Sequence, residues 1–357
     1  MHLGIPALLD FYRAHQDDKS LVLVTIIGTE GSTYRKPAAM MLISGDQKFE
    51  GMISGGCLEG DLLHHAAEVF TSGKPKFVTY DMHANEELVW NLGLGCDGVI
   101  HLMLQRLDRE NGFEFLQQLE KSHEARRAVL LALTIAPDGE IPVGATALID
   151  RADNSAGEPS LLQVLKTASG QNWPEWRYRS LNLAESEDKP DVMLINIPPR
   201  VRVLICGAGP DAVPVARTLS GLDWEVLVVD HRPAYTRPGR FPKSCRVIQA
   251  RPENLRTSLN LDELDAAVIM SHHLENDSVY LRQLAGGSLS YIGCLGPRAR
   301  SARLKEMAGC ERLKIHGPVG LDIGAELPEA IALSLAAEIH AVLNKRSGLS
   351  LTSNVNS

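Results

Sequence analysis

A cysteine that directly follows two glycines is the first feature of this sequence that could do chemistry. The stretch MISGGCLEGD (52–61) places Cys57 after Gly55 and Gly56, and the apolar spacing beyond it predicts a helix. Glycines let the backbone turn, and a thiol at a helix start is favoured as thiolate by the helix dipole and by unpaired backbone N–H groups. Cys57 is therefore interpreted either as a functional thiol or as a small buried side chain in a tight turn.

Two further glycine-flanked stretches carry polar or reactive side chains at predicted strand ends, where binding loops usually lie. GTEGSTYRKPAAMML (28–42) contains Arg35, which suits bidentate recognition of a phosphate and equally a surface ion pair. NLGLGCDGVI (91–100) contains Cys96. If the strands that these stretches terminate are neighbours, Cys57 and Cys96 could face one cavity, and two thiolates would suit a soft metal or a sulfur cargo.

A nucleotide-binding fingerprint opens the second half of the chain. VRVLICGAGPDAVPVARTL, from Val201, combines an apolar strand, a G-x-G-x-x-A turn and an amphipathic helix, and about twenty residues later EVLVVD ends in Asp230. Gly207 makes the tight turn, and Gly209 lets the backbone approach a phosphate. Asp230 suits a ribose 2′-hydroxyl and Arg232 a 2′-phosphate. The choice between NAD and NADP stays open, as does an inherited fold that binds neither.

Alternating strands and helices continue beyond this fingerprint and predict a Rossmann-like, mainly parallel sheet, with Asp230 at the tip of the strand beside the first one. The predicted strands cover 266–270 and 290–293, and the predicted helices cover 275–285, 297–308 and 326–346.

The first half is less regular and is interpreted as a separate α/β domain. Residues 151–190 are rich in Ser, Asn, Glu and Pro and are expected to form loops and short elements. The Pro pair in NIPPRVR marks the boundary, so the expected domains are 1–196 and 197–357. In the first domain an ordinary N-terminal helix, a helix over 113–124, strands at 20–28, 40–44, 98–107 and 128–136, and a hairpin-like segment at 140–150 are predicted.

Composition excludes several classes of protein. With 357 residues, two domains are expected. A net charge of −8 without any block of Lys or Arg argues against nucleic acid and anionic membranes as main partners. No apolar run approaches the ~18 residues of a membrane span, and the N-terminus lacks a secretion signal. Six scattered cysteines without a C-x-x-C pair favour a reducing cytoplasm, and Cys206, Cys245, Cys294 and Cys310 are interpreted as structural thiols.

Matches to one family extend over nearly the whole chain. They run from GTEGSTYR and GGCLE through GLGC-x-G to the nucleotide fold, and they end in SHHLEND, YIGCLGPR and PVGLDIGAELPEAIALSLAAEI. The specific part of the pattern is the co-occurrence of the GGCLE turn with a GLDIGA-x-x-P tail. The chain resembles the xanthine dehydrogenase accessory family, the XdhC/CoxI type of maturation factor for molybdenum hydroxylases.

This resemblance implies a cytoplasmic chaperone more than a catalyst. Such a protein binds the molybdenum cofactor (molybdopterin), protects it while a terminal sulfido ligand is installed, and delivers it to a xanthine dehydrogenase-type hydroxylase. The implied partners are the apo-hydroxylase and a cysteine desulfurase. The long terminal helix is compatible with a homodimer and equally with a helix that covers its own sheet.

The resemblance also implies a cofactor site, with Cys57 as a candidate ligand of the molybdenum. The matching positions are Ser32, Thr33, Arg35, Gly55, Gly56, Cys57, Glu59 and Cys96 in the first domain, and Gly207, Gly209, Asp230, Arg232, His272 and Asp277 in the second.

Four residues depart from the family pattern. Tyr34 stands where a proline is usual, Ala38 where a glycine is expected, Asp97 in place of a second glycine, and Pro297 in place of a serine. A positive φ at Ala38 would be costly, and Asp97 adds negative charge beside an anionic cofactor.

Two other functions stay open. A nicotinamide-dependent oxidoreductase would use the Gly207–Asp230 turn and needs an acid or base, for which His272 is the only attractive candidate. A non-catalytic nucleotide-binding regulator would bind a ligand through its second domain and recognise a partner through its first.

Overall fold

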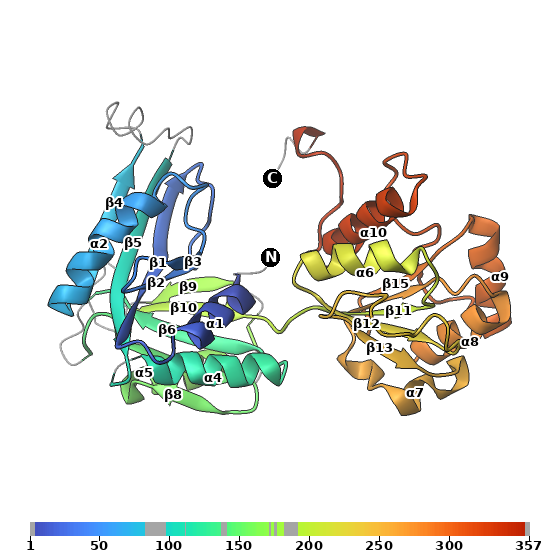
Figure 1. Cartoon of the computed structure of the whole chain (residues 1–357), viewed down its shortest axis with the longest axis horizontal. Coiled ribbons are helices and arrows are strands. Elements are labelled where there is room, and N and C mark those ends of the chain that lie inside the picture. The colour runs from blue at the N-terminus through green and yellow to red at the C-terminus, as the bar shows by residue number, and fades with distance from the viewer. Residues whose placement is uncertain are drawn as a thin grey trace. The chain divides into compact units, whose positions relative to one another are not determined.

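The structure is a computed structural model that describes residues 4–82, 98–110, 112–136, 141–170, 173–174, 177–181 and 192–353. The chain divides into two compact units, Met1–Pro199 and Arg200–Ser357. Unit 1 is coloured from blue to green and unit 2 from yellow to red in Figure 1. No helix among the described residues combines the length and the hydropathy that crossing a membrane requires.

The first sheet of unit 1 is antiparallel and is built around the apolar run that begins at Ser20. Leu21 and Leu23 face one core while Val22 and Val24 face another, because successive side chains of a strand point to opposite faces. Burial on both faces explains why the run is continuously apolar. The strand order is β3-β2-β1-β5-β4, with β1 (Ser20–Gly31), β2 (Met40–Ser44), β3 (Phe49–Gly51), β4 (Lys76–Asp81) and β5 (Gly98–Asp108).

Helices cover both faces of this sheet. Leu62, Ala66 and Val69 of α2 (Glu59–Ser72), spaced at helical intervals, pack on the face that carries Val22 and Val24. On the other face, α1 (Ile5–Ala14) packs against β2 and β3. The expected N-terminal helix is confirmed.

The second sheet of unit 1 is also antiparallel, with the order β8-β7-β6-β10-β9. One of its faces packs with α4 and α1 in the core that also contains Leu21 and Leu23, and α5 covers the other face. The elements are α4 (Phe113–Glu124), β6 (Val129–Thr134), β7 (Thr146–Asp150), β8 (Ser155–Gly157), α5 (Pro159–Ser169), β9 (Tyr178–Leu181) and β10 (Val192–Ile197).

The segment expected to form loops and short elements contains more regular structure than its composition indicates. Helix α5 spans 11 residues within it and begins with Pro159, a residue suited to the first helical turn. The Glu158 side chain accepts a hydrogen bond from the backbone N–H of Ser160. Leu161 and Leu165 then give α5 its fully buried stripe.

Unit 2 is a Rossmann fold whose strand pairs are all parallel, which confirms the predicted sheet. Its order is β13-β12-β11-β14-β15. Asp230 is the last residue of β12, beside β11, as expected. The strands are β11 (Arg202–Cys206), β12 (Glu225–Asp230), β13 (Arg246–Gln249), β14 (Ala266–Ile269) and β15 (Tyr291–Cys294).

Helices pack on both faces of this parallel sheet, as its apolar strands require. Figure 1 shows α6 and α10 on one face, with α7, α8 and α9 on the other, and the two buried clusters divide in the same way. The helices are α6 (Ala212–Gly221), α7 (Leu255–Ser258), α8 (Leu274–Leu284), α9 (Arg298–Ala308) and α10 (Pro328–Leu343), with short 3-10 turns at Pro252–Asn254, Leu261–Glu263 and Leu351–Ser353.

Candidate functional site

Predicted site residues of unit 1 gather at one end of its first sheet. β1 reaches this end at Gly31, which pairs with Gly98 at the start of β5. β2 starts here at Met40, and β3 ends here at Gly51, opposite the next residue of β2. The loop 32–39 and the turn 52–58 therefore leave the same end of the sheet, which is the upper end of unit 1 in Figure 1. Cys96 and Asp97 lie outside the described residues.

The turn before α2 is held from within by Glu59. Its carboxylate accepts hydrogen bonds from the backbone N–H groups of Ile53 (3.1 Å) and Ser54 (2.8 Å) and from the Ser54 hydroxyl (2.5 Å). The Ser54 oxygen in turn accepts the N–H of Leu58 at 2.9 Å, so the arrangement resembles a capping box. Burial alone would raise the pKa of Glu59, but the hydrogen bonds outweigh it and lower that pKa. The acid thus shapes the turn.

Gly55, Gly56 and Cys57 of the same turn remain available to a ligand. Gly55 and Gly56 are exposed, and a methyl group built on either would meet no atom within 4 Å. Gly56 has φ 108°, which a side chain would strain. Cys57 is half-buried against the core under α2 and precedes the helix N-cap, Leu58. A thiol therefore adjoins two exposed peptide groups with open space above them.

The loop after β1 is fixed by close contact with β5. A Cβ at Gly98 would lie 2.6 Å from the carbonyl oxygen of Glu30 and 2.7 Å from that of Ser32, so only glycine fits there. The Thr33 hydroxyl donates to the carbonyl oxygen of Arg35 at 2.8 Å. Thr33 is thereby used to fold the loop, while the Ser32 side chain is exposed.

Arg35 is half-buried and makes no ion pair within the part of the chain that the structure describes. The pKa of Arg177, the residue just before β9, is lowered. Burial is the largest cause, and the positive charge of Arg35 is the second. Two neighbouring guanidinium groups repel each other and favour a bound anion. Arg177 was not predicted from the sequence, because only the fold brings it near the loop.

Ala38 adopts a left-handed backbone conformation, which glycine accepts more readily than alanine. Its φ is 73° and its side chain is fully buried, while its N–H donates to the carbonyl oxygen of Ile26 at 2.9 Å. The expected strain is therefore present in this loop.

In unit 2, the backbone of the glycine turn is packed tightly. The Gly207 N–H donates to the carbonyl oxygen of Val229 at 2.8 Å, and a Cβ at Gly207 would lie 2.6 Å from the backbone of Ser271. The Ala208 N–H donates to Asp230 Oδ2 at 2.8 Å. The turn after β11 is therefore fixed against the ends of both neighbouring strands.

Asp230 and Arg232 are paired with each other. Arg232 donates to Asp230 through Nε (2.9 Å) and Nη2 (2.7 Å), and its guanidinium lies 4.1 Å from the ring centre of Tyr235. Burial would raise the pKa of Asp230, but the bonds from Arg232 and Ala208 outweigh it and lower that pKa. A ribose hydroxyl or a 2′-phosphate would have to displace these contacts.

The histidine and the acid after β14 lie in different surroundings. His272 is exposed and has φ 63°, and its Nε2 lies 2.6 Å from Asp211 Oδ2. Asp277 is buried; Oδ1 accepts from the Ser271 hydroxyl and Oδ2 from Arg300 at 2.6 Å. Asp277 therefore holds the loop in place. Asp211 and Arg300 were missed, although Asp211 stands inside the G-x-G-x-x-A pattern.

Of the thiols interpreted as structural, two are inaccessible, whereas Cys245 and Cys310 are half-buried like Cys57. Cys206 and Cys294 are fully buried, and burial raises the pKa of Cys206 well above its usual value and that of Cys294 to about 12. Burial also raises the pKa of Cys245. Within the described ranges, no group of three His, Cys, Asp or Glu side chains could hold a metal ion.

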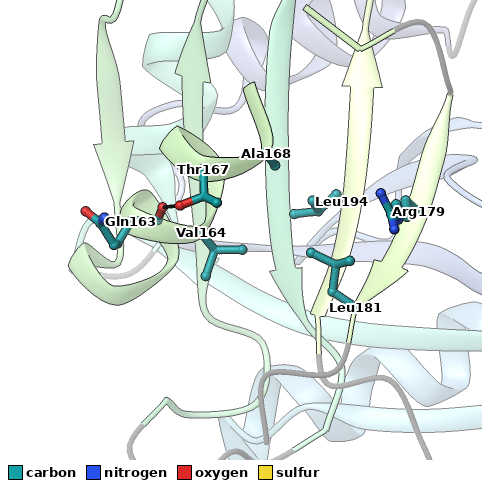
Figure 2. Close-up of a pocket in the computed structure, with 7 residues that line it drawn as sticks. All are labelled: Gln163, Val164, Thr167, Ala168, Arg179, Leu181 and Leu194. Atoms are coloured by element: carbon teal, nitrogen blue, oxygen red, sulfur yellow. Dashed lines mark hydrogen bonds between the residues drawn. The ribbon is translucent and has the colours of Figure 1, made fainter. Parts of the chain in front are cut away.

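A pocket of about 530 Å³ lies elsewhere in unit 1, between α5, β9 and β10 (Figure 2). Arg179 lies at one side and Thr167 at the other, where the hydroxyl donates to the carbonyl oxygen of Gln163 at 3.1 Å. None of the predicted site residues lines it. Its lining consists of Gln163, Val164, Thr167, Ala168, Arg179, Leu181 and Leu194.

The chain is similar to known proteins over nearly its whole length. The XdhC and CoxI family matches residues 14–81, and the XdhC Rossmann domain matches residues 203–339. The chain is 31% identical to a probable xanthine dehydrogenase subunit of Bacillus subtilis (strain 168), over 95% of this chain and 96% of that protein. The chain belongs to the XdhC and CoxI family.

Two further relatives cover most of this family member. It is 25% identical to the molybdenum cofactor insertion chaperone PaoD of Escherichia coli (strain K12), over 91% of this chain and 84% of that protein. The crystal structure of a xanthine dehydrogenase from Bacillus halodurans matches all of both chains with a TM-score of 0.78 and 30% identity. The similarity therefore includes both units.

Proposed function

We propose that this protein is an accessory factor that binds the molybdenum cofactor, protects it while it is sulfurated, and inserts it into a xanthine dehydrogenase-type hydroxylase. Similarity to the insertion chaperone PaoD over 91% of this chain and 84% of that protein supports the proposal. The structural observation that carries it is the exposed glycine turn that presents a half-buried Cys57 at the same end of a sheet as Arg35.

The residues at this end of the sheet fit the chemistry of such a cargo. The cofactor has a molybdenum atom, for which a thiolate is a suitable soft ligand, and a phosphate. Cys57 would hold the metal, and Gly55 and Gly56 would let the backbone approach closely. Arg35 would bind the phosphate, with Ser32 beside it and Thr33 shaping the loop. Glu59 would act by holding the turn.

The proposal also defines the partners. An apo-hydroxylase would receive the cofactor, and a cysteine desulfurase would supply the sulfur for its terminal sulfido ligand. We place the reaction sequence in the cytoplasm, where free thiols persist. A homodimer is the oligomeric state to test first.

The proposal is tested by co-expressing the chain with cofactor biosynthesis and an apo-hydroxylase, under anaerobic conditions. Cys57→Ser should lower the molybdenum and pterin that co-purify with the protein by about tenfold, because a hydroxyl is a poor ligand for a soft metal. The yield of active, sulfurated hydroxylase should fall with them.

Cys310→Ser is the matched control, because Cys310 is also half-buried and lies in unit 2. It should retain both molybdenum and hydroxylase activation. Equal molybdenum and equal activation in wild type and Cys57→Ser would show that Cys57 only fills space.

A further inference from the structure

The switch point of unit 2 differs from a dinucleotide site in its hydrogen-bond donors. Ligands of open α/β sheets bind beyond the carboxyl ends of the strands where the strand order reverses, here between β11 and β14. A pyrophosphate there needs backbone N–H groups at the start of the following helix. Gly207 and Ala208 already donate to Val229 and Asp230, and Pro210 has no N–H. Few donors remain for a pyrophosphate.

The charge at this position also disfavours a pyrophosphate. Asp211 is the N-cap of α6, yet its side chain makes no capping bond to the helix. Its Oδ1 lies only 2.6 Å from the position that a Cβ on Gly209 would take. A carboxylate thus occupies the surroundings of the glycine at which a phosphate would approach the backbone, and the two negative charges would repel each other.

The ribose position is likewise occupied. Asp230 is only 1% exposed, and its two oxygens accept bonds from Arg232 and from Ala208. A ribose diol would therefore have to break a bidentate ion pair before it could bind. The scarcity of free N–H donors, the negative charge of Asp211 and the ion pair of Asp230 each disfavour the binding of NAD or NADP.

Beyond the ends of β11 and β14, the site offers a ligand the carboxylate of Asp211 and the imidazole of His272. His272 Nε2 lies 2.6 Å from Asp211 Oδ2, and the His272 side chain is 61% exposed. Asp211 Oδ1 makes no hydrogen bond within the described residues, so it can accept one from a ligand. This pair is complementary to a ligand that donates N–H groups.

The loop that carries His272 is held in an unfavourable conformation. His272 has φ 63°, and residues in such regions persist only where the surroundings hold them, often at functional sites. Here Ser271 is bonded to buried Asp277, which is paired with Arg300 at 2.6 Å. The buried ion pair therefore keeps His272 beside Asp211.

We propose that the Rossmann unit binds no dinucleotide, and that Asp211 with His272 instead binds a ring bearing an amino group and an adjacent ring N–H, of the pterin class. The amino-pyrimidinone edge of a pterin offers two parallel N–H donors, which suit a carboxylate. The choice of a pterin rests on the proposed function; the exclusion of dinucleotides rests on unit 2 alone. Asp211 is assigned as the residue that recognises the ring.

Binding to the full-length protein is measured by calorimetry with three probes: NAD⁺, NADP⁺ and pterin. Neither dinucleotide should bind with a Kd below about 1 mM, whereas pterin should bind saturably. Asp211→Asn should weaken pterin binding by about tenfold or more, because it removes the charge and replaces one acceptor oxygen by a donor. Asp262→Asn, an exposed acid of the same unit, is the control and should bind pterin like the wild type.

A gain-of-function variant tests the exclusion directly. Pro210→Ala combined with Asp211→Ser restores an N–H donor and removes the carboxylate, so NAD⁺ affinity should rise by about tenfold or more. Unchanged melting temperatures would show that each variant is folded.

Three outcomes would overturn the inference: binding of NAD⁺ or NADP⁺ to the wild type with a Kd below about 1 mM, no binding of pterin, or pterin binding that Asp211→Asn leaves unchanged. Hydroxylase activation by the same variants separates this result from the proposed function. Activation that survives alongside any of these three outcomes would leave the chaperone role standing and reject only the assignment of this site.

Discussion

At the scale of single residues, Glu59 shows how an acid can support a site without touching a ligand. Its carboxylate accepts the backbone N–H groups of Ile53 and Ser54 and the Ser54 hydroxyl, so both oxygens face into the turn that presents Cys57. The same acid was predicted as a cofactor-binding residue. Its hydrogen bonds support an indirect role, in which Glu59 fixes the turn and thereby the position of the Cys57 thiol.

Glu59→Gln should destabilise the protein by about 2 kcal/mol, because hydrogen bonds to a charged, buried group are lost. Chemical unfolding measures the loss, and Glu68→Gln, at an exposed surface pair with Lys76, should change stability by less than about 0.5 kcal/mol. The pKa of Glu59 is lowered in the folded state, so its contribution is full above its ordinary pKa of 4.5 and is lost as the pH falls. A wild-type advantage that stayed constant down to pH 2 would contradict this account.

Ala38 provides a second prediction at this scale. Ala38 and Ala39 are both fully buried, but only Ala38 has a positive φ, 73°. Ala39→Gly should cost about 1–2 kcal/mol, because it removes a buried methyl group and adds backbone freedom to the unfolded state. Ala38→Gly loses the same methyl group but also relieves about 1 kcal/mol of left-handed strain.

Thermal and chemical unfolding of the two variants should therefore differ by about 1 kcal/mol, with Ala38→Gly the more stable. Equal losses would mean that the loop holds Ala38 without strain. The comparison also measures what a left-handed alanine costs this protein.

At the scale of elements, the strand–turn–helix junction at Gly207 is the most constrained part of unit 2. Its φ is 114°, and a Cβ there would lie 2.6 Å from the Ser271 backbone, which cannot move aside like a side chain. Gly207→Ala should thus cost about 3 kcal/mol or more, through strain and overpacking together. Gly239 also has a positive φ, 83°, but has open space around it. Gly239→Ala should cost only about 1 kcal/mol in the same unfolding measurement.

Elements were predictable where burial imposes a strong local pattern. β1 is buried on both faces, so it appears as a continuous apolar run, and the turn from β11 into α6 carries the glycines that its geometry requires. Helix α5 was missed because its fully buried stripe is only Leu161 and Leu165, in a polar segment. β13 was missed because it is a four-residue edge strand with no fully buried side chain.

Contacts between distant loops were not predictable from the sequence. Asp211 and His272 are 61 residues apart, and Asp277 and Arg300 are 23 apart, so no local spacing links them. The fold brings each pair together at the ends of neighbouring parallel strands. The types of residue in these loops could be read from the sequence, but which side chain engages which could not.

At the scale of the whole molecule, the cores of the described residues separate cleanly by unit. Each buried cluster draws its members from one unit alone: three clusters from Met1–Pro199 and two from Arg200–Ser357. A unit with its own core can unfold as its own cooperative element. The chain should therefore show two separable unfolding equilibria.

Hydrogen exchange resolved by peptide mass spectrometry tests this with the two destabilising variants already described. Glu59→Gln should speed exchange in β1, β2 and α2 and leave β11 and β12 unchanged, because Glu59 contributes to unit 1 alone. Gly207→Ala should do the reverse, since its added Cβ strains only the contact between the turn after β11 and the end of β14. If either variant accelerated exchange equally throughout the described parts of both units, the two cores would have to belong to one cooperative unit, and the effects of Cys57 and Asp211 variants could no longer be assigned to separate sites.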